Sequence, residues 1–202
     1  MRLYWRPQTR ASRVEWVLAE LGERYERVLA PESGTPERFR LHPLGRVPVL
    51  EDDDGVRRFE SVALCTWLAD RRPERGLIPR PGTPERATHD QWLMLAVTEV
   101  EPLLDLICLH TEELPPAERN AVVAPWAAGR LRPPLELLER AVAGRPALLG
   151  ERAQVVDLVL TAMLAWAGRQ GHLERFPALR AYRDRLLDRP AARRLFAEAP
   201  PC

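Results

Sequence analysis

Three residues that could do chemistry, Thr9, Arg10 and Ser12, stand close together between a short apolar run and the first helical pattern of the chain. A hydroxyl just before a helix can donate a hydrogen bond to an anion, and the positive end of the helix adds to the attraction. Arg10 brings a charge that it cannot lose. Taken singly, each hydroxyl is most simply a helix cap. The cluster therefore predicts either an anion-stabilising loop or a capped helix start.

The composition excludes several other kinds of chemistry. The sequence contains no lysine, which rules out a Schiff base and a lysine general base. The histidines are scattered without partners at metal-ligand spacing, so we expect no metal site; they are His42, His89, His110 and His172. The 30 basic and 29 acidic residues nearly cancel, and no block of like charges forms a stripe for phosphates or an anionic membrane. We therefore expect neither nucleic acid nor a membrane as a partner.

Cysteine usage and the N-terminus indicate a cytoplasmic protein. The three cysteines, Cys65, Cys108 and Cys202, are odd in number and far apart, and no signal-type apolar core follows Met1. No uncharged apolar run approaches the roughly 20 residues that a membrane span requires. Cys65 falls on the apolar side of an expected helix, so we interpret it as a core residue.

The loop that contains Thr9 is expected to join a strand to a helix. Residues 2–5 favour a β-strand, and the apolar residues of segment 14–21 recur at helical spacing until Gly22. A second apolar piece follows at residues 25–29. This order, together with the later segment at residues 42–50, is typical of a β-α-β unit.

A hairpin and a third helix follow. Asp53, Asp54 and Gly55 form an expected turn between Val49-Leu50 and the segment 56–59, which predicts an antiparallel pair of strands. Ser61 then opens a helical pattern. The N-terminal part is therefore predicted to be a small mixed α/β sheet with helices packed on it.

The rest of the chain is expected to be helical. Prolines and glycines gather between Arg72 and Pro84, so we predict a linker there and two domains, residues 1–74 and 85–202. Residues 155–166 are apolar nearly all round, which predicts a buried central helix. Further helices are expected at 117–143, with an interruption near Arg132-Pro133-Pro134, at 179–187, and from Pro190 onward.

Three stretches in this order resemble the glutathione S-transferase superfamily over nearly the whole chain. Leu3-Tyr4, Pro7 and Ser12-Arg13-Val14 resemble its first strand, active-site loop and first helix. Gly45–Leu50 with Glu60-Ser61 resembles its glutathione site, and Gly144–Gly150 running into Asp157 is similar to the approach to its buried helix. The resemblance implies an α/β thioredoxin-like N-terminal domain and an all-α C-terminal domain.

The resemblance also implies that the loop after Pro7 stabilises the thiolate of glutathione. A cysteinyl thiol has an ordinary pKa of about 8.5, so a transferase must favour the deprotonated nucleophile. Thr9 stands two residues after Pro7, as the catalytic serine does in serine-type members, but the loop here is one residue shorter. Gln8, Arg10 or Ser12 could therefore be the residue that contacts the sulfur.

Partners for the rest of glutathione are implied as well. The Val47-Pro48 peptide is expected to be cis, so that the backbone of Val47 pairs with the cysteinyl backbone of the ligand. Ser61 would bind the γ-glutamyl carboxylate, and Glu60 would bind the ammonium group. Arg46 could help to hold the glycyl carboxylate.

The second substrate and the assembly follow from the same resemblance. We expect a small hydrophobic electrophile beside Trp5, Trp92, Leu95 and Glu99, of which Trp92 and Leu95 could equally be packing residues. The predicted protein is a cytoplasmic homodimer that conjugates glutathione, as a co-substrate and without a metal. Isomerase, dehalogenase and peroxidase chemistry stay open. The alternative is a non-catalytic binding or regulatory protein with the same fold.

Overall fold

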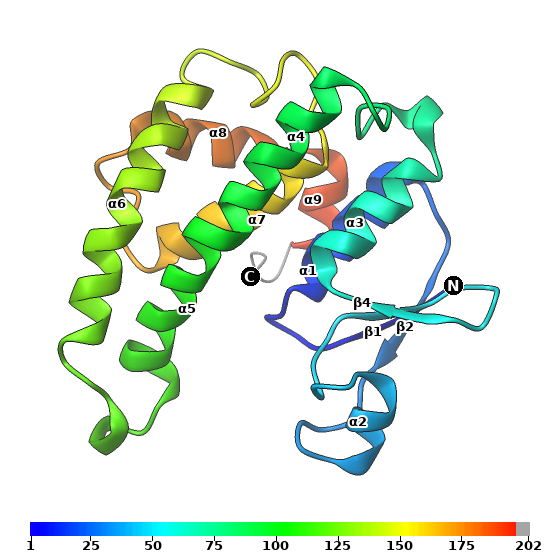
Figure 1. The fold of residues 1–202 in the computed structure, drawn as a ribbon, viewed down its shortest axis with the longest axis horizontal. Coiled ribbons are helices and arrows are strands. Elements are labelled where there is room, and N and C mark those ends of the chain that lie inside the picture. The colour runs from blue at the N-terminus through cyan, green and yellow to red at the C-terminus, as the bar shows by residue number, and fades with distance from the viewer. Residues whose placement is uncertain (197–202) are drawn as a thin grey trace.

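The computed structural model describes residues 1–196, and Cys202 lies outside this range. The N-terminal part is a small sheet with helices packed on it, and the part that follows is built of helices (Figure 1). The last helix beside the sheet ends at Asp70, and the first helix of the helical part begins at Pro84. This architecture confirms the predicted fold class.

The sheet has four short strands in the spatial order β2-β1-β3-β4. These are β1 (Arg2–Trp5), β2 (Glu26–Leu29), β3 (Val49–Glu51) and β4 (Arg57–Phe59). β1 pairs in parallel with β2 and antiparallel with β3, which in turn pairs antiparallel with β4. Leu3 and Leu50 lie opposite each other in β1 and β3, and both are fully buried. The predicted β-α-β unit and hairpin are therefore confirmed.

Three α-helices accompany the sheet, namely α1 (Ala11–Leu21), α2 (Pro36–Leu41) and α3 (Ser61–Asp70). α1 ends at Gly22, whose φ of 73° is accessible to glycine without strain. The sequence analysis missed α2. Thr35 caps this helix by accepting a hydrogen bond from the Arg38 N–H at 3.4 Å, and Pro36 occupies its first turn. These local signals outweigh the polar character of the segment.

The described helical part contains α4 (Pro84–Leu95), α5 (Glu101–Cys108), α6 (Val123–Val142), α7 (Val155–Arg169), α8 (Pro177–Leu187) and α9 (Pro190–Leu195). A π-helical turn, Ala96–Val100, joins α4 to α5, and a second one, Leu109–Glu113, follows α5. A π-helix is wider than an α-helix, so the side chains that follow the π-helical turn at 96–100 are rotated from the positions that α-helical spacing predicts. Among the described helices, none combines the length and the apolar character needed to cross a membrane.

α7 is the buried central helix that the sequence predicts. All residues from Val155 to Ala167 are buried, and α7 packs against α1, α4 and α8. A helix that begins inside the protein needs partners for its first N–H groups. The Asp157 carboxylate accepts from the Gln154 N–H at 2.7 Å, and the His89 Nε2 accepts from the Val156 N–H at 3.2 Å. His89 therefore has a structural role, as expected.

The predicted interruption of a helix near Arg132-Pro133-Pro134 is wrong. α6 runs unbroken from Val123 to Val142, although a proline inside a helix removes a backbone hydrogen bond. Leu131 and Leu135, on either side of the two prolines, are both buried, and α6 packs on α5 and α8. Tertiary packing thus outweighs the local cost of the prolines.

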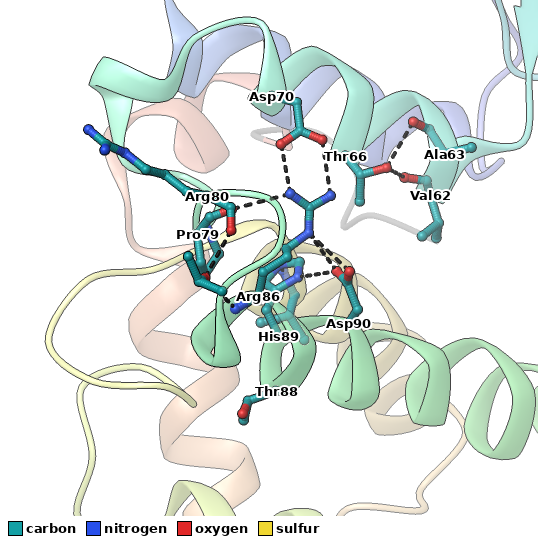
Figure 2. Close-up of polar contacts among 12 residues, drawn as sticks. Val62, Ala63, Thr66, Asp70, Pro79, Arg80, Arg86, Thr88, His89 and Asp90 are labelled. Atoms are coloured by element: carbon teal, nitrogen blue, oxygen red, sulfur yellow. Dashed lines mark hydrogen bonds and ion pairs between the residues drawn. The ribbon is translucent and has the colours of Figure 1, made fainter.

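An arginine cluster ties the sheet part to the helical part near the linker, as Figure 2 shows. Arg86 of α4 donates from its two Nη atoms to both carboxylate oxygens of Asp70 in α3, at 2.7 and 3.0 Å. Its Nε donates to Asp90 at 3.0 Å, and Nη1 also donates to the Pro79 carbonyl at 3.2 Å. We call Asp70, Arg86 and Asp90 the Arg86 cluster. A bidentate contact of this kind fixes the mutual orientation of α3 and α4.

Candidate active site between the two domains

A cleft of about 830 Å³ opens between the sheet part and the helical part. Its lining residues fall within segments 6–10, 33–48, 60–61 and 97–113, and we call it the interdomain cleft. Most of the residues that the sequence singled out for glutathione meet here, namely Gln8, Thr9, Arg10, Arg46, Val47, Pro48, Glu60 and Ser61. Ser12 does not line the cleft.

The loop before α1 uses its hydroxyls within the protein. The Thr9 hydroxyl donates to the Arg6 carbonyl at 2.7 Å and accepts from the Ala11 N–H at 3.4 Å. The Ser12 hydroxyl is buried and makes no hydrogen bond with the described residues. Gln8 has a positive φ of 52° and an exposed side chain at the edge of the cleft. In this structure the Thr9 hydroxyl therefore donates its proton to the Arg6 carbonyl.

Arg10 reaches across the domain boundary to α5. Its Nε donates to Glu101 Oε1 at 2.8 Å, and its Nη2 donates to a carboxylate oxygen of Asp105. The guanidinium also lies over the Trp166 ring, 5.2 Å from the centroid. Burial alone would lower the pKa of Arg10, but hydrogen bonds and attraction from Asp105 and Glu101 raise it above its ordinary value. Arg10 is thus a charged group held on three sides.

Arg13 lies behind Arg10, one turn further along α1. It is fully buried, and its Nη1 and Nη2 donate to the Glu101 carboxylate at 3.1 and 2.6 Å. We call Arg10, Arg13, Glu101 and Asp105 the Glu101 cluster. The sequence analysis missed Glu101 and Asp105. The sequence does show that Glu101 and Asp105 are four residues apart and that Arg10 and Arg13 are three apart, so that each pair can share one side of a helix. Nothing in the sequence indicates that the acidic pair contacts the basic pair.

The sheet side of the cleft carries the cis-proline peptide that the resemblance implies. The Val47-Pro48 peptide is cis, as predicted, and both residues line the cleft just before β3. Ser61 is the first residue of α3 and is 8% exposed, whereas Glu60 before it is exposed with a φ of 71°. The hydroxyl, the carboxylate and the first N–H groups of α3 are therefore available at one end of the cleft.

Arginines gather at the other end of the sheet side. Arg38 of α2 is 5% exposed, yet its Nε and Nη1 have no hydrogen-bond partner among the described residues. Burial, followed by repulsion from Arg6, lowers the pKa of Arg38. Arg6 itself is paired with Glu32 at 2.6 Å, and Arg46 is exposed at the cleft edge. The sequence analysis missed Arg38 because it did not predict α2.

The residues predicted to contact the electrophile lie elsewhere. Trp5, Trp92, Leu95 and Glu99 do not line the interdomain cleft. Trp5 lies beneath Arg27, 3.7 Å from the guanidinium carbon to the ring centroid, while Trp92 and Leu95 pack against the core. The apolar residues of the helical wall are instead Val97, Pro102, Leu106 and Leu109. Across the π-helical turn at 96–100, α-helical spacing from α4 does not hold, so it does not predict which residues of the turn and of α5 face the cleft.

Cysteine and metal chemistry have little support in the described part of the chain. Burial raises the pKa of the Cys65 thiol to about 12, and burial with nearby carboxylates does the same for Cys108. Neither forms a disulfide, and a thiol whose pKa is raised in this way stays protonated at neutral pH. Within residues 1–196, no three histidine, cysteine or acidic side chains are arranged to hold a metal ion.

Two families of known proteins match the chain, one for each part. The family "Glutathione S-transferase, N-terminal domain" matches residues 9–71, and the family "Glutathione S-transferase, C-terminal domain" matches residues 87–185. The matched segments contain every residue discussed above for the cleft apart from Arg6 and Gln8.

Individual proteins are similar over almost the full length. Glutathione S-transferase GstA of Escherichia coli O157:H7 is 26% identical over 197 residues, which are 94% of each chain. A solved glutathione transferase from Methylococcus capsulatus is 30% identical with a TM-score of 0.84, and 96% of each chain is covered. A sphingomonad glutathione S-transferase in complex with glutathione is 25% identical, again with a TM-score of 0.84 and 96% of each chain.

Proposed function

This chain belongs to the glutathione S-transferase family, and on that premise we propose that it is an enzyme that conjugates glutathione to a small hydrophobic electrophile in the interdomain cleft. The glutathione complex of the sphingomonad relative supports glutathione as the co-substrate. The cytoplasmic homodimer implied by the resemblance stays a prediction.

The observation that carries this proposal is the Arg38 guanidinium, whose buried Nε and Nη1 have no hydrogen-bond partner among residues 1–196. A buried charge without hydrogen bonds is costly, so a cleft that contains one is suited to an anion that enters with the ligand. A carboxylate can accept from two N–H groups of an arginine at once. We assign Arg38 to the glycyl carboxylate of glutathione, with Arg46 at the exposed side.

The opposite end of glutathione fits the start of α3. Its γ-glutamyl group carries a carboxylate and an ammonium group. The Ser61 hydroxyl and the N–H groups of the first turn suit the carboxylate, and the Glu60 side chain suits the ammonium group. Val47, between the two ends, would pair through its backbone with the cysteinyl residue.

The thiol of glutathione would then lie near the start of α1, where Arg10 is the donor that the geometry favours. Its Nε and Nη2 are bound to α5, and its Nη1 makes no hydrogen bond with residues 1–196. Thr9 and Ser12 stay predictions, since the Thr9 proton is directed to Arg6 and the Ser12 hydroxyl is buried. The electrophile would contact the apolar wall of Val97, Pro102, Leu106 and Leu109.

Calorimetry with glutathione tests the proposal. The unmodified protein should bind, and Arg38→Met and Ser61→Ala should each weaken binding by about 1.5 to 3 kcal/mol, because each removes a partner of a charged ligand group. Arg40→Met is the matched control, since Arg40 belongs to the same helix but is exposed and paired with Glu37. Absence of binding to the unmodified protein would reject glutathione as the ligand.

The second candidate function is a non-catalytic glutathione-binding protein. The occupied Thr9 hydroxyl and the buried Ser12 hydroxyl favour it, because the loop then offers no hydroxyl to the sulfur.

The ultraviolet absorbance of the thiolate, titrated against pH in the complex, distinguishes the two functions. For the enzyme, we expect the pKa of bound glutathione to lie below that of the free thiol, and Thr9→Val to leave this pKa unchanged. A rise in Thr9→Val would instead identify Thr9 as the donor. A complex without thiolate near neutral pH would favour the binding protein.

A further inference from the structure

The Glu101 carboxylate of α5 accepts hydrogen bonds from two arginines of the other domain, Arg10 just before α1 and Arg13 within it. Oε1 accepts from Arg10 at 2.8 Å and from Arg13 at 2.6 Å, while Oε2 accepts from Arg13 at 3.1 Å. The Glu101 side chain is only 12% exposed. Each of these three hydrogen bonds joins charged groups in a largely dry region, where such bonds are strong and directional.

Arg13 anchors this carboxylate. It is fully buried and does not line the interdomain cleft, so it cannot contact a ligand there. Two hydrogen bonds from one planar guanidinium fix the carboxylate in both position and orientation. Since an unpaired buried charge is costly, Arg13 and Glu101 are strongly held to each other.

Arg10 lines the cleft together with Glu101 and Asp105, and it is the cationic member of the cluster that does so. An arginine side chain has several rotatable bonds and is normally mobile, but here Glu101, Asp105 and the Trp166 ring hold the guanidinium on three sides. The nitrogen that remains, Nη1, makes no hydrogen bond with the described residues. A donor held in this way loses little entropy when it binds an anion.

From this arrangement we infer that Glu101 is a positioning residue, which with Arg13 as its anchor holds the Arg10 guanidinium in place as the hydrogen-bond donor to the glutathione sulfur. The inference rests on the proposed function, because it assumes that the thiolate forms beside Arg10. Glu101 itself does not touch the sulfur and acts through Arg10.

The direction in which the thiol pKa changes on substitution of Glu101 distinguishes a positioning role from a simple effect of its negative charge. Removing a carboxylate near the sulfur leaves the site more positive, which by itself would favour the thiolate and lower the thiol pKa. Releasing Arg10 removes an oriented donor and would raise the thiol pKa. Glu101→Gln removes the negative charge and also releases Arg10. Glutamine keeps one acceptor oxygen for the buried Arg13, but its amide NH₂ repels the guanidinium of Arg10.

We expect Glu101→Gln to raise the pKa of bound glutathione by about half a unit to one unit, as measured by thiolate absorbance. The dissociation constant at a pH where the thiol is protonated should change less than about twofold, since no ligand contact is removed. Arg10→Leu should raise the thiol pKa by at least as much. In the Arg10→Leu background, Glu101→Gln should cause no further rise.

Two further variants keep the test decisive. Asp70→Asn weakens a different arginine contact between the domains, the one with Arg86, which does not line the interdomain cleft, and should leave the thiol pKa unchanged. Asp105→Asn removes the second carboxylate from Arg10 without touching Arg13, so it replaces Glu101→Gln if that variant does not fold, with a smaller rise expected.

A fall or no change in the thiol pKa of the Glu101 variant, or an equal rise in the Arg10→Leu background, would overturn the inference alone. Failure of the unmodified protein to bind glutathione would instead overturn the proposed function, and the inference with it.

Discussion

Two of the arginine clusters between the domains, the Glu101 cluster and the Arg86 cluster, use the same chemistry in different surroundings. In each, an arginine forms a bidentate contact with a carboxylate of the other domain, Arg13 with Glu101 and Arg86 with Asp70. Arg13 and Glu101 are 0% and 12% exposed, whereas Arg86 and Asp70 are 15% and 32% exposed. Only the Glu101 cluster contributes residues to the lining of the interdomain cleft.

This difference shows why the contribution of an ion pair to the free energy of unfolding cannot be judged from its geometry alone. A partly exposed pair competes with water and salt, so its contribution to stability is small. A buried pair contributes little compared with apolar residues of the same shape, but losing one partner is costly because the other charge is left without water. The Glu101 cluster is therefore the more fragile of the two, and it is the one that lines the interdomain cleft.

The largest expected effect is on stability. Glu101→Leu should lower the free energy of unfolding by about 3 to 5 kcal/mol, because it leaves Arg13 buried without its partner. Asp70→Leu should lower it by only about 1 kcal/mol, since Arg86 keeps Asp90 and access to water. Urea unfolding followed by circular dichroism measures both.

The double variant Arg13→Met/Glu101→Leu is the control for this comparison. It removes both buried charges and should regain most of the stability that Glu101→Leu loses. Equal losses for Glu101→Leu and Asp70→Leu would mean that burial does not distinguish the two clusters.

A smaller effect concerns pH. Burial alone would raise the pKa of Glu101, but attraction and hydrogen bonds from Arg13 and Arg10 hold this pKa below its ordinary value. A carboxyl whose pKa is lowered by folding stabilises the protein above its unfolded pKa, about 4.3 for glutamate, and this stabilisation is lost as the pH falls through the folded pKa.

The difference in unfolding free energy between the unmodified protein and Glu101→Gln should therefore be constant from pH 7 to about pH 5 and shrink below about pH 4. It should also be smaller than the loss in Glu101→Leu, because glutamine keeps an acceptor oxygen. Urea unfolding at a series of pH values measures this difference. A difference that grows on acidification would show that Glu101 is not held in its charged form by the arginines.

Much of the fold could be predicted because its signals are local. Gly22 ends α1, Ser61 begins α3, and the turn at 53–55 joins β3 to β4, as expected from the sequence. The sequence analysis missed α2 because this helix is short and mostly polar, without a clear apolar face. It expected α6 to be interrupted because proline has a low helix propensity.

The sequence by itself singled out Thr9-Arg10, Val47-Pro48 and Glu60-Ser61 through its resemblance to a family, and all three pairs line the cleft. Only the tertiary structure decided the partners of these stretches. Glu101 is 88 residues from Arg13, and no local pattern couples the two.

The burial of the Arg38 guanidinium depends likewise on how α2 folds, and the apolar lining at Val97 and Leu106 depends on the π-helical turn and α5. Caps and turns are decided by atoms a few residues apart. The state of a buried charge, in contrast, depends on which distant side chain is packed against it.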